Sequence, residues 1–218
     1  MNPNDDQLNF NNRHLDLLSK HRSVFKDKHV LDYYGLNGFP ADIFRAWGAK
    51  PASARILDVN MRKFAHEYFP DITVIDQISQ NYDVIVICGN SNFELEYNGQ
   101  AIIEELTNCN PEYILLHANA GIESPQPKSA WEISKSLVKH RPNISWYIAM
   151  FQRFGFECDY IEKYLLQYTD YECNFFRFYN TKTVTSTPIT IDQAWQLNFP
   201  ESPRQTDFTW DKFNQVIG

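Results

Sequence analysis

The chain has 218 residues, with 20 Lys or Arg against 27 Asp or Glu, and a formal net charge of -7 at pH 7. A hydrophobic share of 43% and an aromatic share of 15% are enough for one folded domain, which excludes global disorder. No apolar run reaches the roughly 18 residues of a transmembrane helix. The polar, acidic N-terminus lacks the regions of a signal peptide, so we expect a cytoplasmic protein without membrane contact.

The number and spacing of cysteines and glycines exclude further classes of protein. The four cysteines, Cys88, Cys109, Cys158 and Cys173, have no C-x-x-C spacing, which argues against a zinc ribbon or a thioredoxin motif. We therefore expect reduced thiols and no metal site. The acidic balance disfavours nucleic-acid binding, because phosphate neutralisation needs clustered Lys and Arg. With only 8 glycines the chain is not a glycine-rich repeat protein.

In chain order, the apolar pattern of the first half predicts helices that alternate with short strands. Residues 8–21 place leucines at helical spacing, and residues 29–33 read as a strand that ends in an acid and a glycine turn. Pro40 suits the start of a helix over residues 41–47. A strand at 54–59, a helix at 61–69 and a strand at 72–75 follow. The Val/Ile run of residues 82–88 is typical of a strand buried on both faces.

The second half repeats this alternation in a longer form. We expect helices at 99–109, 130–139 and 145–154 and strands at 113–117, 156–160 and 172–179. The pattern predicts an α/β fold, a three-layer α/β/α sandwich around a mostly parallel, doubly wound sheet. The last two strands lack a helical crossover, so one should be antiparallel. We expect one α/β domain over residues 1–180, with a helical segment at 1–25, and a C-terminal extension over 181–218 that packs on it.

The run VLDYYGLNGFP joins the first predicted strand to the following helix. It resembles the first motif of class I S-adenosylmethionine-dependent methyltransferases, an apolar strand followed by D/E-x-G-x-G-x-G. Asp32 matches the acid that ends the strand. Tyr34 and Leu36 stand at the first two glycine positions, and Gly38 keeps the third. The residues between them are Gly35 and Asn37.

The resemblance continues in order over roughly residues 10–180 and implies a Rossmann-like methyltransferase fold that binds S-adenosylmethionine. Asp58 matches the acid that contacts the ribose hydroxyls, and Asp76 matches the acid that faces the adenine amine. Asn90 follows the strongest strand, beneath the expected cofactor. The cofactor-binding residues that the resemblance implies are Asp32, Tyr34, Gly35, Asn37, Gly38, Asp58, Asp76 and Asn90.

Six of these eight residues, all except Tyr34 and Asn37, also have a purely structural explanation as turn or cap residues. Asp32 and Asn90 can stabilise turns through their side chains, and Asp58 can cap the helix that begins before Met61. His117 ends the fifth predicted strand and is the candidate catalytic base, since its unperturbed pKa lies near neutrality. A single histidine at a strand end also serves packing.

Three functions remain open at this stage. The first is a methyltransferase whose acceptor is a small molecule, the favoured case, or a limited macromolecular target. No Asn-Pro-Pro-Tyr loop for planar amines follows the fourth strand, which disfavours methylation of nucleic-acid bases. The second is a catalytically inactive binding or scaffold protein, since a side chain at Tyr34 or Leu36 can fill the cofactor's space. A nicotinamide-dependent oxidoreductase is weaker, because its G-x-G-x-x-G turn is missing. A homo-oligomer is left open.

Overall fold

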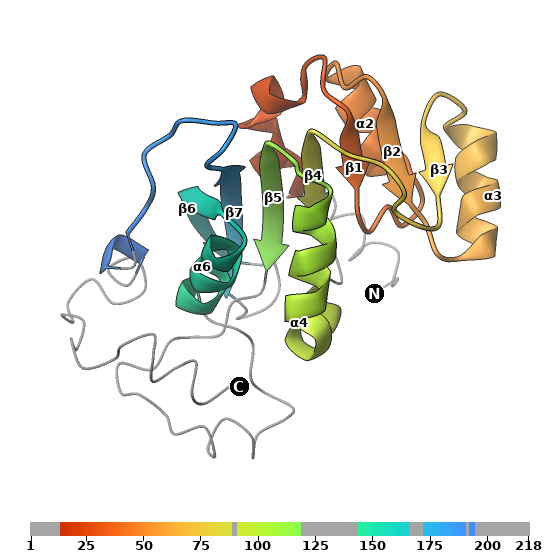
Figure 1. The fold of residues 1–218 in the computed structure, drawn as a ribbon. Helices are drawn as coiled ribbons and strands as arrows, with labels where there is room; N and C mark the ends of the chain where they lie inside the picture. The colour runs from red at the N-terminus through yellow and green to blue at the C-terminus, as the bar shows by residue number, and fades with distance from the viewer. Residues whose placement is uncertain (1–13, 89–90, 119–143, 166–171, 191, 195–218) are drawn as a thin grey trace.

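The computed structural model describes residues 14–88, 91–118, 144–165, 172–190 and 192–194. Within these residues, seven strands form one sheet in the order β3-β2-β1-β4-β5-β7-β6. The strands are β1 (Val30–Asp32), β2 (Ala52–Arg55), β3 (Thr73–Ile75), β4 (Val84–Ile87), β5 (Tyr113–Ala118), β6 (Phe156–Leu165) and β7 (Glu172–Asn180). The chain works outward from β1 to β3 and then starts again at β4, so the strand order reverses between β1 and β4 (Figure 1).

The sheet is parallel from β3 to β5, and β7 runs antiparallel to both of its neighbours, β5 and β6. This confirms the expected antiparallel strand near the C-terminal end. The physical reason is the length of the connection, because only residues 166–171 join β6 to β7. A parallel crossover needs about a dozen residues or more.

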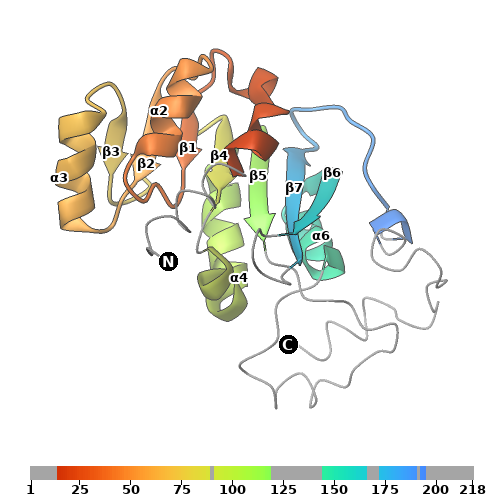
Figure 2. The same ribbon diagram turned by 180° about the vertical axis from the view of Figure 1, so that it is seen from behind.

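Helices lie on both faces of the sheet, which confirms the three-layer architecture. The helical residues 14–19, the 3-10 helix η1 (Arg22–Phe25) and α2 (Phe39–Ala46) cover the face that is in front in Figure 2. The other face carries α4 (Ser91–Asn108) and α6 (Ile144–Arg153), in front in Figure 1. Helix α3 (Val59–Tyr68) lies beside the edge strand β3.

Strand β4 shows why the sheet is buried on both sides. All four of its residues are buried; Val84 and Val86 join the core under η1 and α2, whereas Ile85 and Ile87 join the core under α4 and α6. Successive side chains of a strand point to opposite faces, so a strand between two helical layers needs apolar residues throughout. The Val/Ile run that marked this strand in the sequence is thereby explained.

Several element boundaries differ from the sequence prediction. Strand β2 covers Ala52–Arg55 and not residues 54–59. It cannot continue to residue 59 because Asp58 already caps α3. Ile56 is buried although it follows the last residue of the strand. Helix α4 begins at Ser91 and not at residue 99. The helix predicted at 130–139 lies outside the described residues. The N-terminal helix is described only from residue 14 to residue 19.

The start of the C-terminal segment packs on the domain. The Ile189 N–H donates to the Cys158 carbonyl at 2.7 Å, and Ala194 is fully buried in the core under α6. The phenol of Tyr179 donates to the Ser186 carbonyl at 3.0 Å. Residues 195–218 lie outside the described part, so the division at residue 180 stays a prediction. None of the described helices combines the length and apolar character that crossing a membrane requires.

Candidate functional site

The carboxyl ends of β1 and β4 flank the reversal of strand order, the place where open α/β sheets bind ligands. The described residues line a small, partly open cavity of about 20 Å³ there. It is lined by His14, Leu15, Leu18, Asp32, Tyr34, Leu36, Pro40 and Cys88. The lining thus combines the end of β1 and its turn with the end of β4 and the N-terminal helix. A space of this size holds about one water molecule.

Asp32, the last residue of β1, is the chemically distinctive member of this lining. It is only 2% exposed, and burial raises its pKa to about 7, although a hydrogen bond from the Tyr34 backbone N–H acts in the opposite direction. Its Oδ2 has no hydrogen-bond partner among the described residues. A buried acceptor without a partner is costly, so this oxygen is a strong candidate for binding a ligand's donor.

The turn after Asp32 has residues with positive φ, although two of the glycines of the family motif are replaced by other residues. Leu36 has a φ of 31°, in the left-handed region that side chains disfavour, and Gly38 has a φ of 87° at the N-cap of α2. The Asn37 carboxamide oxygen accepts from the Phe39 N–H at 3.1 Å and so stabilises the start of α2. The Tyr34 side chain lines the cavity, at the position where the family motif has no side chain.

Asp58 lies beyond the end of β2 and caps α3. Its Oδ1 accepts from the backbone N–H groups of Asn60 and Met61, both at 2.8 Å. The prediction that Asp58 caps this helix is therefore confirmed. Its Oδ2 takes part in neither bond, so the cap leaves one carboxylate oxygen for a ligand.

Replacing Asp58 with alanine is expected to lower the free energy of unfolding by about 1 kcal/mol, because two N–H groups at the start of α3 lose their acceptor. Asp58→Asn, which keeps a capping oxygen, should change it by only a few tenths of a kcal/mol. Urea unfolding of the two variants measures the difference. Equal losses for alanine and asparagine would show that the cap does not stabilise the helix.

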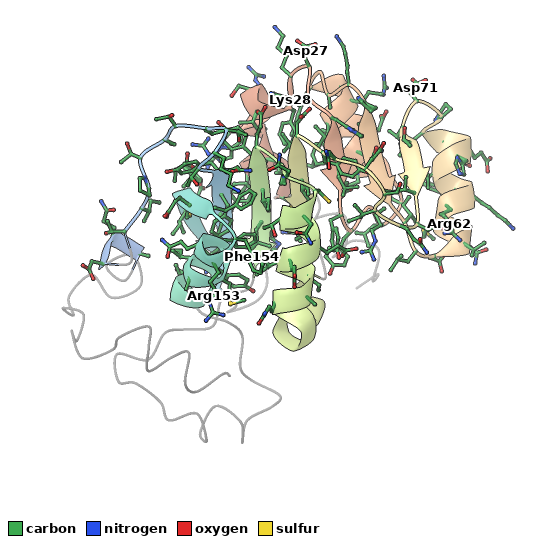
Figure 3. The ribbon with its side chains drawn as sticks, in the orientation of Figure 1. Asp27, Lys28, Arg62, Asp71, Arg153 and Phe154 are labelled. Atoms are coloured by element: carbon green, nitrogen blue, oxygen red, sulfur yellow. The ribbon has the colours of Figure 1, made fainter. Side chains whose placement is uncertain are left out.

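Asp76, which follows β3, is 66% exposed and pairs with Arg62 of α3 at 3.2 Å. Figure 3 labels Arg62 towards one end of α3 and Asp71 near the other. Asp76 is thus held at the carboxyl edge of the sheet by a surface ion pair. Asn90 lies outside the described residues.

His117, the candidate base, is fully buried within β5 and faces the N-terminal helix. Its Nε2 lies 3.2 Å from Nε2 of His14, so one ring donates to the other. Burial lowers the pKa of His14 to about 3, and burial followed by the charge of His14 puts the pKa of His117 well below its usual value. Both rings are therefore neutral at pH 7. His14 lines the cavity, whereas His117 is not part of its lining.

The structure also places residues that the sequence analysis did not assign. Arg55 ends β2, where the shifted strand prediction had put Asp58, and its guanidinium carbon lies 4.6 Å from the Tyr33 ring centroid. The Tyr33 phenol donates to Glu105 at 2.7 Å. Leu15 and Leu18 line the cavity from the N-terminal helix, and their helical spacing was the only signal for them. Among the described residues, no cluster of three or more His, Cys, Asp or Glu is arranged to hold a metal ion.

No protein-family model and no curated protein sequence matches this chain. Several solved structures, however, superpose on this chain. The cyclopropane synthase from Mycobacterium tuberculosis superposes with a TM-score of 0.61 at 12% identity, over 76% of this chain and 84% of that one. Magnesium protoporphyrin IX methyltransferase from Synechocystis PCC 6803 with bound S-adenosylmethionine gives 0.58 at 13% identity, over 81% and 80%. A candidate RNA methyltransferase from Pyrococcus horikoshii gives 0.55 at 12%, over 78% and 84%.

At such low identity the likeness concerns the fold. The strand order, the antiparallel β7 and the helices on both faces agree with the architecture implied by the sequence motif. The chain therefore has the fold of the class I S-adenosylmethionine-dependent methyltransferases.

Proposed function

We propose that this chain is an S-adenosylmethionine-dependent methyltransferase that acts on a small-molecule acceptor. The observation that carries the proposal is the buried carboxyl of Asp32, which presents an unpartnered Oδ2 among the described residues. It stands at the carboxyl end of β1, beside the reversal of strand order. The solved relatives of the fold support the same class of cofactor.

The residues at this edge offer suitable donors and acceptors for the cofactor. Asp32 would accept from its ammonium group, and the Oδ2 of Asp58 is available to the ribose hydroxyls. Asp76 and Asn90 are assigned to the adenine side and to the loop after β4. Backbone groups of the turn at residues 34–38 would border the amino-acid portion.

The size of the cavity sets a condition on this binding. Drug-sized ligands occupy pockets of about 300–1,000 Å³, far more than the roughly 20 Å³ that the described residues line here. Binding therefore requires that Tyr34, Leu36 or the helix at residues 14–19 moves outward. The strained φ of Leu36 makes the turn a natural place for such a change.

When bound, the cofactor would supply an electrophilic methyl group on a sulfonium. The protein's part is then to hold the acceptor in line and to exclude water, which the apolar Leu15, Leu18 and Leu36 favour. For an acceptor that must lose a proton, the candidate base is the His14–His117 pair. Burial holds both pKa values well below 7, so the pair can accept a proton only when the outward movement of the helix at residues 14–19 exposes His14 to water. Both rings are neutral, and His14 is the member that lines the cavity.

A second function has a specific observation in its favour. Tyr34 and Leu36 line the cavity in place of glycines, which is the arrangement expected of a catalytically inactive binding or scaffold protein with this fold. In that case the cavity stays closed, and the carboxyl of Asp32 serves the packing of the turn. The two functions differ in whether the cofactor binds.

Isothermal titration with S-adenosylmethionine and S-adenosylhomocysteine separates them. We expect the wild-type chain to bind at least one of the two ligands with a dissociation constant in the micromolar to millimolar range, Asp32→Asn to weaken binding at least about tenfold, and Tyr34→Gly to strengthen it. Absence of binding by either ligand at millimolar concentration would rule out the methyltransferase. Binding only by Tyr34→Gly would establish the closed, inactive protein.

A further inference from the structure

Helix α3 is attached to the domain by a narrow contact. Within Val59–Tyr68, all of which the structure describes, Ala65 alone is buried. The large apolar side chains of this helix and of the residue before its cap face solvent instead. Leu57 is 56% exposed, Met61 42%, Phe64 38% and Tyr68 59%. A helix at the edge of a sheet normally turns such residues inward, so this outer face is an unusual surface.

The four exposed residues form one band, which we name the α3 stripe: Leu57, Met61, Phe64 and Tyr68. Met61, Phe64 and Tyr68 are three and four residues apart, which keeps them on one side of a helix with 3.6 residues per turn, and Leu57 stands just before the Asp58 cap. The rings of Phe64 and Tyr68 stack with centroids 4.4 Å apart, which holds the middle and one end of the stripe together. Val59 is also 54% exposed, but it lies on the opposite side of the helix by the same periodicity.

We propose that the α3 stripe is the interface at which two copies of this chain form a two-fold dimer. The spacing of four, three and four is the same in both directions, so two antiparallel α3 helices present matching stripes to each other. Leu57 then lies opposite Tyr68 of the second copy, and Met61 lies opposite Phe64. Each layer pairs one aliphatic with one aromatic side chain, the large-with-small alternation that fills a helix interface.

The exposed apolar area is in the range that such a dimer needs. With about 150–250 Å² for an aromatic side chain and somewhat less for an aliphatic one, the exposed fractions correspond to roughly 300–400 Å² per copy. A standard interface buries about 800 Å² per partner, of which some 56–65% is apolar. The stripe supplies most of that apolar share, and the polar residues beside it, such as Asn60 and Glu67, supply the rim.

Charge also favours this helix as the meeting point. The chain as a whole carries -7, so two copies repel each other in general. Helix α3 instead contains Arg62 and Lys63 against Glu67, and Arg62 is paired with Asp76, so this region lacks the strong negative charge of the chain as a whole. Two copies that meet at α3 therefore avoid the acidic remainder of the surface. This inference does not depend on the proposed methyltransferase activity.

Sedimentation velocity of the full chain over about 1–200 µM tests the dimer. We expect the mass to rise from 25.6 kDa to twice that value with increasing concentration. Phe64→Glu, near the centre of the interface, and Tyr68→Glu, at its end, should each raise the dissociation constant at least about tenfold, because each would bury an unpaired carboxylate. Val59→Glu, on the opposite side of the same helix, should leave the dissociation constant unchanged.

Circular dichroism and thermal unfolding of each variant test whether the protein is still folded. We expect all three variants to fold, because the substituted side chains are exposed. A wild-type chain that stays monomeric at every concentration would overturn the proposal and would leave the stripe to another partner or another part of this chain. A dimer that withstands both glutamate variants would overturn it as well, since the contact would then lie elsewhere.

Discussion

Gly35→Ala is expected to lower the free energy of unfolding by about 3 kcal/mol, at the upper end of the cost of overpacking. A Cβ at this position would lie 2.7 Å from the Cβ of Ala54 and 3.1 Å and 3.2 Å from the backbone of Ala54 and Arg55. The turn after β1 therefore lies directly against β2, and a backbone neighbour cannot move aside as the end of a side chain can. For a chain of this length the loss corresponds to a fall in Tm of roughly 6–12 °C.

Gly155→Ala is the matched control for this prediction. Gly155 has a φ of 82°, but a Cβ there would meet no described atom within 4 Å. Its substitution should cost about 1 kcal/mol through backbone strain alone. The double variant Gly35→Ala with Ala54→Gly should recover part of the loss, since it removes the nearest clashing atom. A Gly35→Ala variant no less stable than Gly155→Ala would refute the close approach.

Acidification from pH 6.5 to pH 5 is expected to destabilise the protein by an amount on the order of 2–3 kcal/mol. Burial lowers the pKa of His14 to about 3 and that of His21 to about 4, and it puts the pKa of His117 well below 6.5. In the unfolded chain these groups take up protons near pH 6.5, whereas the folded protein keeps them neutral. The unfolded state therefore binds more protons, and stability falls as the pH falls through this window.

Asp32 acts in the opposite direction. Burial raises its pKa from 3.8 to about 7, so between these values the folded state holds the proton that the unfolded state releases. Its contribution to stability rises with acidity in the window where those of the three histidines fall. The histidines outweigh one carboxyl, and the net effect is acid destabilisation.

Urea unfolding at pH 7, 6 and 5 at constant ionic strength measures this dependence. His21→Gln should flatten the slope by about one proton, since it removes a ring whose Nδ1 accepts from Arg177 at 3.2 Å and cannot be protonated in place. Asn60→Gln, at an exposed position of α3, changes no titratable group; it is the control and should leave the slope as in the wild type. A wild-type chain that gains stability on acidification would contradict the assignment.

The prediction of the fold succeeded where the sequence pattern is local. The Val/Ile run of β4 predicts a strand that is buried on both faces, and the structure has it so. The short connection between β6 and β7 permits only antiparallel pairing of these two strands. The end of β2 was misplaced because the apolar residues at 56 and 57 continue the strand pattern. In the structure Asp58 accepts two backbone N–H bonds and starts the helix, and this capping decides the boundary.

The sequence by itself determined the class of fold and the turn at its centre, because strand periodicity, helix caps and the Asp32 motif are properties of neighbouring residues. Only the tertiary structure decided the state of the site. It brought Leu15 and Leu18 against Tyr34 and Leu36, and it left Asp32 buried with an oxygen unpartnered among the described residues. It also turned the apolar side of α3 outward. These outcomes depend on which segments distant in the chain pack together, and packing, unlike periodicity, is not encoded in the spacing of any one segment.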